Sequence, residues 1–174
     1  IDGNSLSFAQ NQSLRILLQR IKASGKQVWV YLYARERSAL YLSSIADRVY
    51  MLPTGSLFWN GLGGHHPFYK KFLDTLGLKA DFERAGSYKS FAEPYTKAGA
   101  SEEYREQYTA LLSSIQDQML REVSSGRDID VSILREELGT APFTAERAKE
   151  LGLVDELAYE DQFELELESF TKSK

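Results

Sequence analysis

The chain has 174 residues and a formal net charge of −4 at pH 7, and 43% of its residues are hydrophobic, 12% aromatic and 26% charged. This composition is typical of a globular domain and too apolar for an intrinsically disordered chain, and the acidic balance argues against nucleic acid as a partner. Cysteine is absent, which excludes disulfides, cysteine nucleophiles and thiolate metal sites.

The sequence contains no apolar run that approaches the ~20 residues of a membrane span. It starts at Ile1 without an initiator methionine and enters a helical pattern almost at once. We therefore expect a fragment of a longer protein whose upstream part, including any targeting segment, has been removed.

Strands and helices alternate over the first half of the chain. Leucine and isoleucine residues at helical spacing predict a first helix that ends at Gly25. The β-branched and aromatic run at residues 27–34 is typical of a buried parallel strand. We expect a short helix at residues 38–46, a second strand at 47–53, and a glycine-rich strand or turn at 55–64.

Helices dominate the second half. A helix at residues 67–77 and a third strand at 78–85 precede a long amphipathic helix, which Ser101 can cap and Gly126 can end. The remaining elements are two shorter helices and a final short strand, at residues 131–138, 144–152 and 153–158.

This order of elements predicts an α/β fold with a parallel sheet flanked by helices and a helical second half. We expect a single domain over residues 1–158. An acidic segment, residues 159–174, follows as either a helix or a linker.

Lys89 is the first candidate for chemistry, because it stands near Tyr88 and Phe91 in a stretch that we expect to be partly buried. An ordinary lysine has a pKa of ~10.4 and is no base at neutral pH. Apolar surroundings lower that pKa, and bringing it to ~7.5 requires roughly 4 kcal/mol. A neutral lysine can take the proton of a serine hydroxyl. The alternative is a lysine whose stem packs on Tyr88 while its ammonium group stays in water.

Other polar residues offer weaker signals. His65 and His66 are adjacent, so in a strand they point to opposite faces and make a poor chelating pair, and we expect no metal site. Ser38 lies in no recognisable nucleophile elbow. We expect Glu93 and Pro94 to be structural, because a proline favours an extended conformation of the residue before it.

The neighbourhood of Lys89 carries a specific motif of six residues, followed by a serine and a glutamate at the start of the long helix: Gly86, Tyr88, Lys89, Ser90, Glu93, Pro94, Ser101 and Glu103. With its flanks, residues 64–107, this stretch resembles the lysine-bearing segment of the signal peptide peptidase A family, also called protease IV. Weaker similarity covers residues 24–34, 41–56 and 148–158. The resemblance implies a crotonase/Clp-type α/β fold and a Ser–Lys dyad without metal or nucleotide cofactors. In that dyad Lys89 is the general base, and Tyr88 and Ser90 support it.

The chain departs from the family at the nucleophile. Domains of the family that carry the nucleophile have a serine followed by two glycines at the start of the helix after the second strand. Arg37 occupies that position here, and Ser38 and Ala39 replace the glycines. The backbone thereby loses its easy approach to a peptide carbonyl. Ser38, one residue away, stays as an alternative nucleophile.

The resemblance therefore predicts the lysine-donating domain of a Ser–Lys peptidase that degrades cleaved signal peptides and other apolar peptides. Its expected partners are a serine-bearing domain of the same protein or of a neighbouring protomer, apolar peptide substrates, and further copies in a homo-oligomer. The resemblance also implies association with a membrane, at its periplasmic or extracytoplasmic face, or in a plastid of a photosynthetic eukaryote.

Two rival functions remain open. The domain could be a degenerate repeat without catalysis that serves as a scaffold or as a wall of the peptide-binding space. It could also be an acyl-thioester enzyme on the same fold, although the sequence offers no clear acyl-CoA signature.

Overall fold

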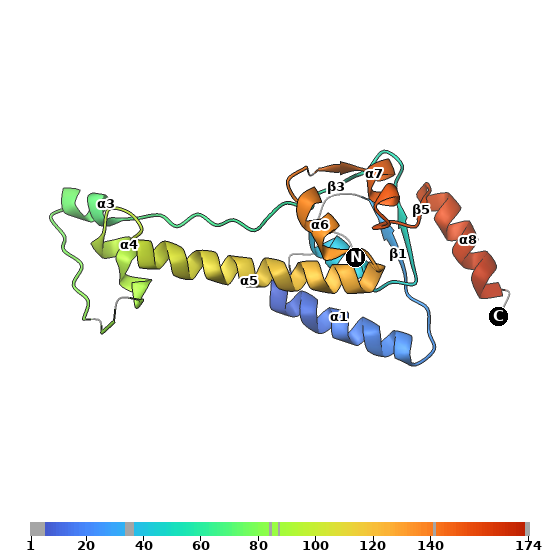
Figure 1. Ribbon diagram of the computed structural model, residues 1–174, viewed down its shortest axis with the longest axis horizontal. Helices are drawn as coiled ribbons and strands as arrows, with labels where there is room; N and C mark the ends of the chain where they lie inside the picture. Colours follow the sequence, from blue (N-terminus) through green and yellow to red (C-terminus); the bar gives the residue numbers. More distant parts are fainter. Residues whose placement is uncertain (1–5, 34–36, 84, 87, 141, 173–174) are drawn as a thin grey trace. The chain divides into compact units, whose positions relative to one another are not determined.

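The computed structural model describes residues 6–33, 37–83, 85–86, 88–140 and 142–172 (Figure 1). The chain divides into two compact units. The first comprises Ile1–Gly61 and Gln118–Lys174, and the second is the inserted segment Leu62–Asp117. The predicted domain over residues 1–158 stays a prediction, and the two units are described separately below.

The first unit is built on a small parallel sheet in the strand order β1-β2-β5 (Figure 1). Val30 pairs with Val49, and Tyr50 pairs with Glu156, in both cases in parallel. The elements of this unit are α1 (Phe8–Ala23), β1 (Trp29–Leu32), α2 (Arg37–Ser43), β2 (Arg48–Met51), β3 (Ser56–Leu57), α6 (Val131–Glu137), β4 (Phe143–Thr144), α7 (Ala145–Glu150), β5 (Glu156–Leu157) and α8 (Glu160–Lys172). The predicted α/β fold with a parallel sheet and a helical second half is confirmed.

The core of this unit lies against the central strand. Only the first residue of β2 is exposed. Val49, Tyr50 and Met51 are all buried, so neither face of the strand is polar beyond that residue. A strand that helices cover on both faces has this near-continuous apolar character. The other fully buried apolar side chains include Leu40 of α2, Leu134 of α6 and Leu153 after α7.

A buried arginine joins α1 to its neighbours. Arg15 is only 4% exposed, and its guanidinium donates to the Ser44 hydroxyl at 2.6 Å and to the Glu122 carbonyl at 2.8 Å. Gly126 lies beside it, where a Cβ atom would stand 2.5 Å from the Ser44 carbonyl oxygen. The long helix α5 (Glu102–Arg127) continues one residue past Gly126, so close packing, and not helix termination, requires this glycine.

The acidic segment at the C-terminus is a helix. α8 begins at Glu160 and packs two phenylalanine rings against aromatic side chains of β1 and β2. Figure 1 labels this helix near the C-terminus. The Phe170 ring centroid lies 5.0 Å from that of Trp29, and the Phe163 centroid lies 5.0 Å from that of Tyr50. Of the two alternatives for this segment, the helix is confirmed.

The second unit contains short elements around the first part of α5: α3 (Lys70–Thr75), the 3₁₀ helix η1 (Ser90–Ala92) and α4 (Glu93–Thr96). The strand predicted at residues 78–85 is wrong, because the described part of that stretch is irregular. Leu78 and Phe82 are 55% and 43% exposed there, and a strand requires a neighbour to satisfy its backbone groups. Within the described ranges, no helix combines the length and apolarity needed to cross a membrane.

Candidate active site

A glycine turn presents Lys89. Gly86 has φ +95°, a backbone conformation that residues with a side chain rarely adopt. The Lys89 amide donates to the Gly86 carbonyl at 3.4 Å. Lys89 precedes η1, which begins at Ser90. The glycine of the motif is therefore required by the turn that leads into the lysine.

Two side chains of α5 hold the residues on either side of the lysine. The Tyr88 hydroxyl donates to the Glu106 carboxylate at 2.8 Å, and the Ser90 hydroxyl donates to Gln107 Oε1 at 2.8 Å. The hydrogen bond to Glu106, together with the charge of that carboxylate, raises the pKa of Tyr88 above its ordinary value. Sequence reasoning missed Glu106 and Gln107, because no spacing rule links them to residues 17 and 18 positions earlier.

Glu93 fixes the segment at a third place. Its carboxylate is 1% exposed and accepts from Lys97 Nζ at 2.8 Å, from the Ser101 hydroxyl at 2.7 Å and from the Ser101 amide at 3.1 Å. Burial acts to raise the pKa of Glu93, but the hydrogen bonds from Lys97 and Ser101 outweigh it and hold the pKa at about 2. The geometry agrees with the structural role expected of Glu93.

The expected extended conformation of Glu93 is wrong. Glu93 is the first residue of α4, with φ −60° and ψ −38°, and Pro94 follows in the first helical turn. A proline is tolerated there because the amide groups of a first turn have no helical acceptor. The early position of Pro94 thus outweighs its steric bias on the preceding residue.

Lys89 faces an open, mainly apolar groove of about 630 Å³. Residues from the lysine segment and from one side of α5 line it: Tyr88, Lys89, Ser90, Phe91, Tyr104, Gln107, Tyr108 and Leu111. The groove thus gathers Lys89 and both of its predicted supporting residues, Tyr88 and Ser90.

The expected partial burial of Lys89 is wrong for this chain. Lys89 is exposed, and the Phe91 and Tyr88 side chains beside it are 83% and 53% exposed. The aromatic neighbours expected from the sequence are present, but they form a rim and do not cover the ammonium group. Among the described residues, Lys89 has no hydrogen bond or ion pair from its side chain.

The candidate nucleophile belongs to the other unit. Arg37 and Ser38 are the first two residues of α2, and Ser38 is half-buried. The nearby Ser43 and Ser44 are fully buried, and their hydroxyls donate to the carbonyls of Leu40 and Tyr41. Ser43 and Ser44 therefore serve the packing of α2.

The two adjacent histidines lie at the surface. His65 and His66 are exposed, and the His66 ring packs edge-on against Tyr108 with 4.5 Å between centroids. Over the ranges that the structure describes, no group of three or more His, Asp or Glu side chains is placed to hold a metal ion.

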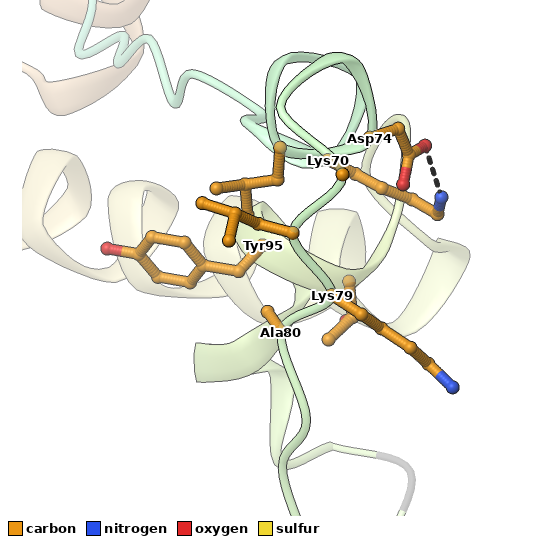
Figure 2. Close-up of a pocket in the computed structure, with 9 residues that line it drawn as sticks. Lys70, Asp74, Lys79, Ala80 and Tyr95 are labelled. Carbon is orange, nitrogen blue, oxygen red and sulfur yellow. Dashed lines mark hydrogen bonds and ion pairs between the residues drawn. The ribbon is translucent and has the colours of Figure 1, made fainter.

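A second, smaller pocket of about 430 Å³ lies between α3 and α4. Figure 2 shows Lys70 and Asp74 of α3 turned toward each other, with 2.6 Å between Lys70 Nζ and the Asp74 carboxylate. Tyr95 and Ala80 lie on the opposite wall, and Lys79 extends outward into solvent (Figure 2). Lys70 is therefore paired with a carboxylate of its own helix.

The chain is similar in sequence to known peptidases. The model of "Peptidase family S49" matches residues 20–173. Protease 4 of Haemophilus influenzae is 30% identical over 112 residues, which are 64% of this chain and 18% of that protein. Protease 4 of Salmonella typhi is 27% identical over 132 residues, or 74% of this chain and 21% of that protein.

A plant protein is also similar over most of the chain. The chloroplastic serine protease SPPA of Arabidopsis thaliana is 24% identical over 162 residues, which are 93% of this chain and 24% of that protein. The chain thus spans about a fifth to a quarter of the length of the curated relatives that it matches.

Proposed function

The chain belongs to peptidase family S49, and from this premise we propose that it is the lysine-donating domain of a Ser–Lys serine peptidase. One observation carries the proposal. Gly86, Tyr88, Ser90 and Glu93 each have a local structural task, whereas Lys89 has no side-chain partner among the described residues and stands at an apolar groove. A lysine without a structural task, on a segment that the other motif residues hold in place, is a candidate for chemistry.

In the proposed reaction, Lys89 acts as a neutral amine. Its lone pair takes the proton of a serine hydroxyl while the serine oxygen attacks a peptide carbonyl. The resulting ammonium returns the proton to the leaving amine, and an acyl-enzyme forms. Water then attacks the acyl group with the same amine as base, which releases the peptide acid and restores the serine.

A serine-bearing domain of the same protein or of a neighbouring protomer supplies the nucleophile in this proposal. A lysine in open water keeps its proton, because hydration favours the ammonium form. The surface that brings the serine therefore also has to exclude water from Lys89. The exposed rings of Phe91 and Tyr88 give that surface apolar area to cover.

Apolar peptides, including cleaved signal peptides, are the proposed substrates. The groove beside Lys89 offers Phe91, Tyr104 and Leu111 as walls for apolar side chains. Burial of one such side chain stabilises a complex by roughly 1.5–3 kcal/mol. A crotonase/Clp-type fold, homo-oligomeric assembly, and a membrane-associated periplasmic, extracytoplasmic or plastid location belong to the same proposal, and the chloroplastic relative supports the last of these.

The non-catalytic scaffold is the second candidate, and the exposure of Lys89 favours it. The full-length protein distinguishes the two functions. Lys89→Ala and Lys89→Arg are assayed on an apolar reporter peptide, with circular dichroism to establish folding. As general base, Lys89 requires both variants to lose activity by orders of magnitude, because guanidinium cannot give up its proton near neutral pH. Near-normal activity of folded Lys89→Arg would refute the catalytic proposal.

A further inference from the structure

The segment that carries Lys89 is tied to α5 immediately before and immediately after the lysine. Tyr88 donates to Glu106, and Ser90 donates to Gln107, each at 2.8 Å. The two acceptors are consecutive residues of one long helix. We infer that Glu106 and Gln107 are positioning residues for the reaction, and that they set the direction in which Lys89 leaves the backbone.

The two hydrogen bonds hold the lysine segment at two different positions of α5. Consecutive helical residues project about 100° apart around the helix axis, so the two hydrogen bonds cannot act as a single hinge. Gly86, with its positive φ, lies two residues before Tyr88 and is the point in the turn with the greatest backbone freedom. Without the bonds to α5, we expect the backbone at Lys89 to gain the freedom that this glycine allows.

The two hydrogen bonds contribute little to overall stability, so their main effect is on the position of Lys89. All four side chains lie at the surface of the unit, where water competes for each hydrogen bond. Glu93, buried and held by Ser101, already fixes the segment to the start of α5. The additional bonds at Tyr88 and Ser90 therefore act chiefly on the backbone at Lys89.

Catalysis is sensitive to such placement. A base must reach the serine hydroxyl at hydrogen-bond distance, and a misplacement of about 1 Å costs on the order of a hundredfold in rate. The long side chain of lysine has its own rotational freedom, so a fixed Cα position narrows the space that its amine explores. The inference rests on the proposed role of Lys89 as general base.

The test uses the full-length protein and an apolar reporter peptide. Gln107→Leu and Glu106→Leu each remove one acceptor, and leucine keeps the helix because it has a high helix propensity. Glu106→Gln removes the charge but keeps an acceptor for Tyr88. Thr109→Ala, at an exposed position of α5 outside the groove, is the matched control.

We expect kcat to fall between about tenfold and a hundredfold in the two leucine variants, with KM changed less than about twofold. Glu106→Gln should keep kcat within about threefold of the wild type, and Thr109→Ala should be unchanged. Tyr88→Phe deletes only the donor hydroxyl and should match Glu106→Leu. Thermal melts identify any variant that fails to fold. If a leucine variant fails to fold, the kcat of Tyr88→Phe tests the positioning role instead.

The outcomes separate this inference from the proposed function. If Lys89→Ala is inactive while Gln107→Leu and Tyr88→Phe keep the wild-type kcat, the positioning role is refuted and the base survives. If Lys89→Ala is itself active, the proposed function fails first. Equal losses in Glu106→Gln and Glu106→Leu would assign the effect to charge and would overturn the assignment to the hydrogen bond.

Discussion

The buried carboxylate of Glu93 should stabilise the folded second unit by about 2–3 kcal/mol. Its pKa is about 2 against an ordinary value of 4.5, because Lys97 and Ser101 stabilise the charged form against the opposing effect of burial. Such a difference corresponds to about 3 kcal/mol. Lys97 is 36% exposed, so solvent screening reduces the benefit, and we expect the lower part of that range from Glu93→Gln.

The sign of the pH dependence follows from the lowered pKa. The carboxylate stabilises the fold fully above pH ~4.5, and the contribution disappears as the pH falls toward 2, with roughly half of it lost by about pH 3. Urea unfolding should therefore separate wild type from Glu93→Gln at pH 7, and much less at pH 3. Glu102→Gln, an exposed glutamate of α5, is the control and should show a small effect at both pH values.

Hydrogen exchange locates the loss. At pH 7, amides of the lysine segment and of the first turns of α5 should exchange roughly 30-fold faster in Glu93→Gln, as about 2 kcal/mol requires. Amides of β1 and β2 provide an internal reference in the first unit. Identical exchange in Glu93→Gln and Glu102→Gln would show that Glu93 does not anchor the segment.

Two further predictions concern the 174-residue chain by itself. A serine-reactive fluorophosphonate should leave it unlabelled, because in the resemblance to the family Arg37 stands at the nucleophile position. Stoichiometric labelling of Ser38 in mass spectrometry would contradict a nucleophile supplied by another domain. The chain should also self-associate, because Phe91, Phe72 and Leu78 are 83%, 62% and 55% exposed. Light scattering that gives a monomer at high concentration would count against an apolar docking surface around Lys89.

The sequence predicted those elements whose signals are local. Ser101 caps the long helix as expected, because its hydroxyl accepts from the Tyr104 amide at 3.2 Å. The strands β1 and β2 lie inside the predicted runs, since β-branched and aromatic residues fit a sheet that helices cover. The strand predicted at residues 78–85 is wrong, because alternating apolar residues do not show whether a neighbouring strand exists.

Long-range contacts explain what the sequence could not provide at the site. The motif predicts a role for Lys89 and its neighbours. The hydrogen-bond partners Glu106 and Gln107 lie on a different element, where many exposed polar residues look the same. The same limit applies to α1, where the leucine pattern predicted the helix correctly. Its buried residues are nevertheless Asn11 and Arg15, while Leu17 is 51% exposed.

In the mechanism we propose, the base and the nucleophile come from two different domains, and the exposure of Lys89 agrees with that proposal. The hydrogen bonds from Tyr88 and Ser90 to α5, together with the Glu93 anchor, can hold the lysine backbone before any partner arrives. They cannot remove water from the ammonium group, because the groove beside it is open. In the mechanism we propose, the serine-bearing surface makes that change when it covers Phe91 and the rest of the rim. Placement of the base would then be a property of this chain, and its activation a property of the assembly, so that loss of the partner surface would abolish the reaction without moving Lys89.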